Sequence, residues 1–484
     1  MDKSIRDKYT VVIGLEVHAQ LATSTKIYNS DATNFGNSPN TNISVITLGH
    51  PGTLPKLNKK VVEYAIKMGL ACRSEISREM IFDRKNYFYP DLPKGYQITQ
   101  DRTPICVGGK VWVSPRNGEE REIRLNRIHI EEDAGKSIHL PEETDTLVDF
   151  NRAGVPLIEI VTEPDLRSSD EAHSFLNEVR KLVKYLDICD GNMEEGSLRC
   201  DANISVMLKD AKEYGKKVEV KNMNSMRNLQ HAIEHEIERQ ITALEAGEEI
   251  LSETRTFDVA TGTTSGMRTK EELNDYRYFP DPDLSPVHVS EEWLAQIEAT
   301  MPALPRELYE AFIKDYDLPA YDAQILTDSK EIATYFQQLC KNTNNYKAAS
   351  NWLMGPVKSV LNEQGINMID FPLHPQQLAE IIELVDSNKV SHSAASQQLF
   401  PEMLKNNEDS ALKLAEKLNL VQDSNENSIG LIIDEVIAEN EKKVEEYRKG
   451  KKGLIGMFMG QVMNKSEGKA DPQLANQLLR EKLK

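Results

Sequence analysis

The stretch Arg127-Ile-His-Ile-Glu-Glu-Asp-Ala-Gly-Lys-Ser137 carries three adjacent carboxylates at the end of an alternating apolar run. These carboxylates are Glu131, Glu132 and Asp133. A period of two residues predicts a β-strand, with His129 and Glu131 on one face and Glu132 on the other. Neighbouring like charges repel and must be neutralised, either by solvent on a loop or by a hard cation in a cleft. The stretch therefore predicts a strand with a candidate cation site, and a solvated acidic turn is the alternative.

The flanking residues extend this strand and exclude one phosphate-binding motif. Upstream, Asn117-Gly118 is a strong hairpin-turn signal, and Ile123 and Leu125 continue the alternation. Downstream, Gly135-Lys136-Ser137 is similar to the end of a P-loop, but the earlier glycine at the required spacing is missing. We therefore predict a β-hairpin here and no Walker motif.

Composition indicates a soluble globular protein without a membrane span. The chain has 484 residues, enough for two to four domains, with 39% hydrophobic and 28% charged residues. The first ten residues are polar and charged, which predicts no signal peptide, and no apolar run approaches the roughly 20 residues of a membrane helix. The five scattered cysteines favour a reducing, cytoplasmic location. The formal net charge of −19 argues against nucleic-acid binding across the whole surface but leaves a local basic patch open.

A second alternating stretch runs from Tyr9 to Leu21. It predicts a half-buried strand whose polar face carries Glu16 and His18 side by side. Such a pair is often structural or solvated, and it points to a site only if a second acidic cluster meets it. The strand around Glu131 is the first candidate for that cluster.

Three more carboxylates lie in apolar or alternating surroundings. Glu159 stands alone in an apolar run, and a buried carboxylate needs a partner or a metal. Glu195 and Asp201 fall within a further acidic strand, from Met193 to Ser205. Helices are expected after the capping box of Ser168 and from Asn228 to Leu244.

The order of these patterns predicts an α+β fold with three domains. An N-terminal cradle domain, 1–292, holds a mixed or antiparallel β-sheet with helices and ends near a proline-rich linker, Pro280–Pro286. Beyond the linker the patterns are helical, giving an all-helical domain, 293–405. The polar run Lys405–Asp409 precedes a small helical tail domain, 406–484.

Several segments together resemble one family, the B subunits of the aspartyl/glutamyl-tRNA amidotransferases. Each segment alone is a weak signal, but all of them occur in the family's order and span nearly the whole chain. The matching segments are Val12-Ile-Gly-Leu-Glu-Val-His18, Asp83-Arg-Lys-Asn-Tyr-Phe-Tyr-Pro90, His129–Ser137, Asn151-Arg-Ala-Gly-Val-Pro-Leu-Ile-Glu-Ile-Val161, Glu194-Glu-Gly-Ser-Leu-Arg-Cys-Asp201, Lys221-Asn-Met-Asn-Ser225 and Asp275-Tyr-Arg-Tyr-Phe-Pro280.

The resemblance implies a cytoplasmic heterotrimer in which the B subunit joins an amidase and a small third protein. The amidase releases ammonia from glutamine. The B subunit uses ATP and Mg²⁺, with Mn²⁺ as a possible substitute, to phosphorylate the side-chain carboxylate of Glu-tRNA(Gln) or Asp-tRNA(Asn). Channelled ammonia then displaces the phosphate. Which of the two misacylated tRNAs is the substrate is not decided by the sequence.

The resemblance also assigns roles to single residues. Glu16, His18, Glu131 and Glu132 are implied as the catalytic metal site, with His18 acting through water because imidazole is an unusual Mg²⁺ ligand. Lys85 is implied at the channel exit, beside Glu131 or Glu132. Weaker candidates for the site are Arg84, Asp133, Glu159, Glu195 and Asp201.

The chain departs from many family members in one loop. Those members carry a zinc knuckle, CxC followed by CxxC, just after the first strand. The matching positions here are Asn29, Asp31, Ser44 and Thr47, and none of them is a thiolate. We therefore predict no structural zinc.

The C-terminal region is similar to a small stand-alone helical family, and in the amidotransferases this tail binds tRNA. Basic residues cluster there within an otherwise acidic chain, and a solvated charged helix is the alternative. The implied tRNA-binding residues are Lys442, Lys443, Arg448, Lys449, Lys451, Lys452, Lys465 and Lys469. Two rival functions stay open: a non-catalytic tRNA-binding scaffold and a metal-dependent nuclease.

Overall fold

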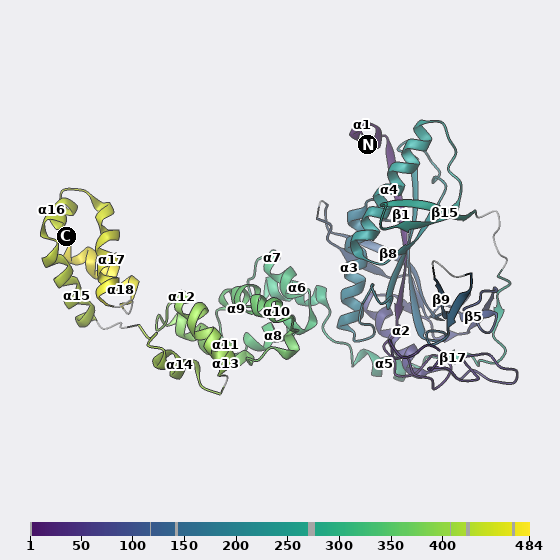
Figure 1. Cartoon of the computed structure of the whole chain (residues 1–484), viewed down its shortest axis with the longest axis horizontal. Helices are drawn as coiled ribbons and strands as arrows, with labels where there is room; N and C mark the ends of the chain where they lie inside the picture. The colour runs from purple at the N-terminus through teal and green to yellow at the C-terminus, as the bar shows by residue number, and fades with distance from the viewer. Residues whose placement is uncertain are drawn as a thin grey trace. The chain divides into compact units, whose positions relative to one another are not determined.

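The computed structural model describes residues 2–116, 118–140, 144–269, 276–406, 408–422, 426–466 and 470–484. The chain divides into two compact units, Met1–Leu304 and Pro305–Lys484 (Figure 1). A multi-stranded sheet with helices forms the first unit, and helices form the second, so the predicted α+β class is confirmed.

A ten-stranded mixed sheet forms the centre of the first unit. Its strand order is β15-β14-β13-β12-β1-β11-β8-β6-β2, with β7 paired to β8. Neighbouring strands are antiparallel except for the parallel pair β13 and β14. The strands are β1 Tyr9–Gln20, β2 Glu75–Ile76, β6 Cys106–Val107, β7 Lys110–Val113, β8 Arg121–Glu132, β11 Pro156–Thr162, β12 Leu198–Leu208, β13 Val218–Met223, β14 Glu253–Asp258 and β15 Thr263–Thr269. The predicted hairpin is β7–β8, and Asn117 of its turn lies outside the described residues.

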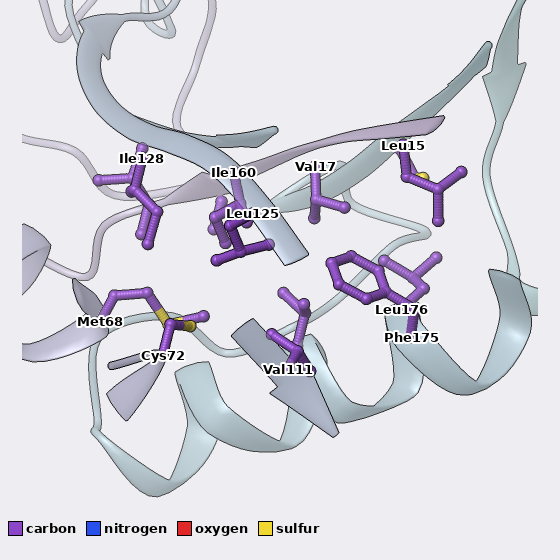
Figure 2. Close-up of a cluster of buried hydrophobic side chains, with 14 of the residues drawn as sticks. Leu15, Val17, Met68, Cys72, Val111, Leu125, Ile128, Ile160, Phe175 and Leu176 are labelled. Atoms are coloured by element: carbon purple, nitrogen blue, oxygen red, sulfur yellow. The ribbon is translucent and has the colours of Figure 1, made fainter. Parts of the chain in front are cut away.

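One face of the sheet packs against helices, which leaves the other face for polar side chains. The helices of this unit are α1 Lys3–Arg6, α2 Lys59–Ala71, α3 Ser169–Tyr185, α4 Met226–Glu245 and α5 Glu291–Glu298. Leu15 and Val17 of β1 are fully buried and point toward Phe175 and Leu176 of α3 (Figure 2). Because side chains alternate along a strand, the side chain between Leu15 and Val17 faces away from these helices.

Ser168 caps α3 as predicted, but the reciprocal bond from Glu171 goes to the residue before the cap and so departs from a standard capping box. The Ser168 hydroxyl accepts a hydrogen bond from the Glu171 amide, and the Glu171 carboxylate accepts one from the Arg167 amide. These bonds satisfy amides that have no partner inside the helix. The cap fixes where the helix begins and so where Phe175 and Leu176 meet the sheet.

The proline-rich segment Pro280–Pro286 belongs to the first unit and is not a domain boundary. It lies between two short strands, β16 Phe279–Pro280 and β17 Val287–His288, that pair with β4 and β3 of the same unit. Prolines mark a break in regular structure, whether or not a domain ends there. The remaining short strands are β3 Glu79–Met80, β4 Asp83–Asn86, β5 Tyr96–Thr99, β9 Lys136–His139 and β10 Thr146–Asp149.

Helices account for all regular structure in the described part of the second unit. They are α6 Pro305–Lys314, α7 Ala320–Leu326, α8 Lys330–Leu339, α9 Tyr346–Trp352, a π-helical turn Leu353–Val357, α10 Lys358–Gln364, a 3₁₀ turn Met368–Asp370, α11 Pro375–Asp386, α12 His392–Ala394, a second π-helical turn Ala395–Leu399, α13 Phe400–Lys405, α14 Ala411–Lys417, α15 Glu426–Glu439, α16 Glu441–Arg448, a 3₁₀ turn Lys452–Leu454, α17 Ile455–Lys465 and α18 Pro472–Lys482. Among the described residues, no helix is both long enough and apolar enough to span a membrane.

Helix α14 associates with the helices that precede it. It packs against α11, and the Gln422 amide just beyond it donates to the Lys389 carbonyl. The tail has its own apolar core, which begins at Ile429 and ends at Leu483. The tail domain was predicted to start at residue 406. The helical unit on which the predicted tRNA-binding residues lie has an apolar core that starts later than that.

The loop that follows β1 is held by polar contacts. The Asn29 amide donates to the Thr47 hydroxyl at 3.0 Å, and that hydroxyl donates to the Asp31 carboxylate at 2.5 Å. Beside this cluster, the buried Lys26 ammonium donates to the backbone carbonyls of Asn42, at 2.7 Å, and Phe150, at 3.3 Å. Three of the four positions that match the zinc knuckle thus lie in a hydrogen-bonded cluster that links the two arms of the loop.

Candidate metal-binding face of the sheet

The register of four strands brings polar side chains into one row on the face that lacks the helices. His18 of β1 lies opposite Glu159 of β11 on one side and opposite Arg199 of β12 on the other. Glu159 in turn lies opposite His129 of β8. Directly opposed side chains in a sheet approach to about 4.5–5.5 Å between Cβ atoms. Strand pairing alone therefore places the His18 imidazole on one side of the Glu159 carboxylate and the His129 imidazole on the other side.

His18, Glu131 and Glu159 form the first carboxylate group. Their potential ligand atoms all lie within 4.8 Å of one another. His18 Nε2 is 3.4 Å from Glu159 Oε2 and 3.7 Å from Glu131 Oε1. His129 Nε2 closes the group from the other side, 3.3 Å from Glu159 Oε2 and 3.9 Å from Glu131 Oε2.

Burial and charge act in opposite directions within this group. Burial opposes a charge on His18, but the carboxylates of Glu159 and Glu131 outweigh it and raise the pKa of His18 to about 9. Burial also opposes the charge on Glu159, and the two histidines overcome it and lower the pKa of that carboxyl. The pKa of Glu131 is raised by burial and by the charge of Glu159. Of the two carboxylates in this group, Glu131 is thus the one whose negative charge is less balanced by neighbouring positive charge.

Glu16, Asp201 and Glu219 form the second carboxylate group, again with potential ligand atoms within 4.8 Å of one another. Glu16 lies opposite Asp201 in the β1–β12 register, and its carboxylate accepts a hydrogen bond of 2.8 Å from the Asn203 amide. Burial and the charge of Glu159 raise the pKa of Glu16. The Lys221 ammonium contacts Asp201 directly and lies 3.1 Å from Glu219 Oε1.

Glu132 and Asp133 lie outside both groups. The Glu132 carboxylate accepts hydrogen bonds from the Lys94 ammonium and from the Ile98 amide, the latter at 2.9 Å. It lines a cavity of about 120 Å³ that Lys94 and Asp133 also line. Asp133 accepts 2.8 Å hydrogen bonds from Arg199 and Gln20. The structure therefore does not bring Glu132 together with Glu16, His18 and Glu131.

The remaining candidates from the first unit occupy three different surroundings. Lys85 Nζ lies 4.8 Å from the ring centroid of Tyr276, and its charge acts to lower the pKa of Glu131. The Arg84 guanidinium is held at 2.8 Å by each of two aspartates, Asp281 and Asp283. Glu195 is exposed and belongs to neither carboxylate group.

Sequence reasoning did not single out Glu219 and ranked Glu159 and Asp201 as weaker candidates, whereas the structure places all three in the carboxylate groups. A signal for Glu219 was present, because Val218 and Val220 alternate with Glu219 and Lys221 as they would in a strand with one polar face. Which carboxylates meet depends on the strand order, in which β1 lies between β11 and β12. Spacing along the chain does not encode that order.

The donor atoms of both groups suit a hard divalent cation. Carboxylate oxygens are the ligands that Mg²⁺ and Mn²⁺ prefer. Within the described residues, Nδ1 of the buried His129 has no hydrogen-bond partner, so this imidazole keeps an unused polar atom next to the first group. Two groups of like charges packed this closely fit the binding of cations.

The basic residues of the tail differ in how far they are already paired. Glutamates of the same tail bind Lys443, Lys449, Lys451 and Lys465. Lys452 Nζ lies 4.3 Å from the ring centroid of Tyr447. Lys442 and Arg448 are exposed, and Lys469 lies outside the described residues. Among the described candidates, Lys442 and Arg448 are exposed and form neither an ion pair nor a ring contact, so they are the first candidates for phosphate contacts.

Comparison with known proteins assigns the chain to one family. The model of the GatB/GatE catalytic domain matches residues 11–295, and that of the GatB domain matches residues 334–483. The chain is 50% identical over 479 residues to the B subunit of the aspartyl/glutamyl-tRNA(Asn/Gln) amidotransferase of Caldicellulosiruptor saccharolyticus, covering 98% of this chain and 99% of that protein. It is 49% identical over 472 residues to the protein of the same name from Thermodesulfovibrio yellowstonii, covering 98% of each.

The first family match includes every residue of the two carboxylate groups. The class defined by sheet and site is thus that of the GatB/GatE catalytic domains. The chain belongs to the family of aspartyl/glutamyl-tRNA(Asn/Gln) amidotransferase B subunits.

Proposed function

We propose that this chain activates and amidates the side chain of misacylated Glu-tRNA(Gln) or Asp-tRNA(Asn), within a cytoplasmic complex that also contains an amidase and a small third protein. ATP supplies the phosphoryl group, and Mg²⁺ or Mn²⁺ is the cofactor. The proposal extends the names of the relatives, which describe one component of a tRNA amidotransferase. The observation that supports it is the pair of carboxylate groups on one face of the sheet, to which β1 contributes His18 and Glu16.

The reaction needs two steps because a carboxylate is a poor electrophile. In the first, a side-chain carboxylate oxygen attacks the γ-phosphorus of ATP, the bond to the β-phosphate oxygen breaks, and ADP leaves. In the second, ammonia attacks the carbonyl carbon of the acyl phosphate and the carbon–oxygen bond to phosphate breaks. Two nitrogen-bound protons stay in the amide, and the third leaves with phosphate.

Phosphoryl transfer of this kind is catalysed mainly by positioning and by neutralising phosphate charge. His18, Glu131 and Glu159 would hold one divalent cation, and Glu16, Asp201 and Glu219 a second. Bound there, the cations supply Lewis acidity toward phosphate oxygens. Arg199 and Lys221 add positive charge on the same face of the sheet.

Lys85 is proposed at the point where ammonia arrives. Its ammonium lies over the Tyr276 ring, and its charge reaches Glu131 of the first group. A positively charged side chain at the end of an ammonia channel must not occupy the nitrogen lone pair, because ammonia attacks through that lone pair. The aromatic ring supports that role by fixing the position of the ammonium.

The tail is proposed to bind the tRNA. Lys442 and Arg448 are exposed on a chain with a formal net charge of −19, so the tail offers a restricted basic surface to an anionic partner. Phosphate contacts there would add affinity without reading base sequence. The reacting aminoacyl end then has to be delivered to the first unit.

The test is conversion of purified Glu-tRNA(Gln) to Gln-tRNA(Gln) by the chain together with its two partner proteins. Each of ATP, Mg²⁺, glutamine and the individual proteins is left out in turn. We expect product only when all are present, and ADP formation that depends on the misacylated tRNA. Product formation without ATP, or ADP formation that ignores the tRNA, contradicts the proposal, and RNA cleavage would point to a nuclease instead.

A further inference from the structure

We infer that Lys221 is an internal counter-cation that occupies the second carboxylate group until a nucleotide arrives. The inference rests on the proposed function, because it concerns the order in which that site takes up its two cations. It predicts that the protein alone binds one divalent cation tightly and that the second enters together with the nucleotide phosphates.

The position of the Lys221 ammonium carries the inference. It contacts the Asp201 carboxylate directly and lies 3.1 Å from Glu219 Oε1, so it binds two of the three members of the second group. Lys221 and Glu219 lie two residues apart on β13, which puts them on the same face of the strand. The bulge between Cys200 and Ala202 of β12 adjusts the pairing at this point of the sheet.

A divalent cation and this ammonium compete for the same oxygens. Mg²⁺ binds carboxylate oxygens at about 2.0–2.1 Å, which leaves little room for an ammonium already in contact with them. The two positive charges also repel each other at such short range. A cation that enters the second group must therefore displace Lys221 or bind weakly.

Among the described residues, no lysine or arginine forms an ion pair with the carboxylates of the first group. Within the described residues, the ion pairs of Glu131 and Glu159 are all with His18 and His129. An imidazole nitrogen is a common metal ligand, whereas a lysine ammonium has no lone pair to offer a metal. The first group can thus accept a divalent cation without displacing a permanent charge.

Phosphate gives the displaced ammonium a new partner. A lysine ammonium is a compact charge on a flexible four-carbon stem, and it is a common phosphate ligand. The side chain of Lys221 is 31% exposed, so it has a path toward solvent on the open face. Movement of Lys221 onto a nucleotide phosphate frees Asp201 and Glu219 for the second cation and links the two binding events.

The experiment measures Mn²⁺ binding to the full-length chain by the electron paramagnetic resonance signal of free Mn²⁺, with and without a non-hydrolysable ATP analogue. We compare the unmodified chain with Lys221→Met, which removes the charge, and Lys221→Arg, which keeps it. Lys217→Met, at an exposed lysine just before β13, is the matched control. Circular dichroism and thermal unfolding verify that each variant is folded.

Without nucleotide we expect the unmodified chain and the Lys217→Met control to bind one Mn²⁺ tightly and a second at least about tenfold more weakly. Lys221→Met should bind two with similar affinity, and Lys221→Arg should behave like the unmodified chain. The ATP analogue should tighten the second site of the unmodified chain much more than that of Lys221→Met.

Two outcomes separate the inference from the proposed function. Two equal Mn²⁺ sites in the unmodified chain without nucleotide, or a second site that weakens in Lys221→Met, overturns the role of Lys221 and leaves the metal sites standing. Absence of Mn²⁺ binding in every chain, with nucleotide present, overturns the metal-dependent function itself. If Lys221→Met is unfolded, Lys221→Gln, which also removes the charge and keeps a polar end, takes its place in the same comparison.

Discussion

Glu16 and His18 project from the same face of β1, two residues apart, yet their side chains enter different carboxylate groups. His18 meets Glu159 across the β11 edge, and Glu16 meets Asp201 across the β12 edge. One strand therefore contributes a ligand to each of two candidate cation positions. Changes at Glu16 and His18 should affect different cations.

Glu16→Ala and Glu132→Ala should have different effects, although both changes remove a glutamate from the same sheet. Glu16→Ala removes an oxygen donor from the second carboxylate group and should slow transamidation about 100-fold or more while glutaminase activity of the complex largely survives. Glu132→Ala leaves both groups intact but strips Lys94 and the Ile98 amide of their acceptor. It should lower the free energy of unfolding by about 2–4 kcal/mol.

Steady-state transamidation and denaturant unfolding of both variants test this difference. A Glu132→Ala chain of unchanged stability that has lost transamidation would return Glu132 to the metal site. Glu16→Asp, which keeps the carboxylate, is the control and should retain more activity than Glu16→Ala.

Lys26 should make stability depend on pH in the alkaline range. Burial lowers the pKa of Lys26 from 10.5 to about 8, against the opposing charges of Asp31, Glu132 and Asp149. Between these two pKa values the unfolded state binds more protons than the folded state, so stability from this group rises with pH across that window. Across the whole window, this difference in pKa raises the free energy of unfolding by about 3 kcal/mol. Below pH 8 Lys26 is charged in the folded state, and the burial of that charge lowers the free energy of unfolding.

The measurement is the unfolding free energy of the unmodified chain and of Lys26→Met at several pH values from 7 to 10.5. The difference between the two should grow in favour of the unmodified chain as pH rises, because the neutral amine still donates to the Asn42 and Phe150 carbonyls. A difference that stays constant over this range would show that Lys26 is not strained by its charge in the folded state.

The chain should hold no structural zinc. Asn29, Asp31 and Thr47 are already satisfied by hydrogen bonds within their loop, and none is a thiolate. Elemental analysis after purification without chelators should find far less than one zinc per chain. A variant with cysteine at Asn29, Asp31, Ser44 and Thr47 is the positive control and should acquire about one zinc. Stoichiometric zinc in the unmodified chain is the contradicting result.

Removal of residues 423–484 should weaken tRNA binding and leave the catalytic unit folded. The cut keeps α14 with α11, against which it packs, and every member of the carboxylate groups precedes Pro280. Each lost phosphate contact should reduce the slope of log affinity against log salt by about 0.7–0.9. Filter binding at several salt concentrations measures both quantities, and unchanged values would exclude the tail as the tRNA-binding surface.

Point variants sharpen that test. Lys442→Ala combined with Arg448→Ala should reduce the salt slope by about one to two, because both side chains are exposed and available to phosphate. Lys465→Ala is the matched control, since Glu435 and Glu439 already hold its ammonium. If the double variant and Lys465→Ala reduce the salt slope equally, the tail attracts tRNA through its overall positive charge and not through specific phosphate contacts.

The alternation of residues predicted where the strands lie, but it did not predict which strands pair with one another in the sheet. Alternation correctly identified the strand that holds Glu16 and His18, and it placed Glu131 and Glu132 on opposite faces, as the structure has them. The order of the strands decides which carboxylates meet, and the pairings of β1 with β11 and β12 join residues more than a hundred positions apart. Glu159 moved from a weak candidate to the centre of the first group for that reason.

Domain limits were harder to read because the same residue types end a strand and end a domain. The Pro280–Pro286 segment has the composition of a linker, but paired aspartates within it bind Arg84 and tie it to the first unit. The polar run before α14 resembles a boundary in composition, yet Ala411 and Leu414 are buried there. Only the packing of side chains tells a turn from a linker.

The central place of β1 has a consequence for how the protein is made. Its two hydrogen-bonding neighbours, β11 and β12, end at Thr162 and Leu208, so β1 leaves the ribosome long before either of them. At about 5–20 residues per second the wait for β12 lasts roughly 10–40 seconds. Until β11 emerges, both edges of β1 are open to other chains, and one edge stays open until β12 follows. Slow synthesis or overexpression should therefore favour aggregation of nascent chains through their first twenty residues.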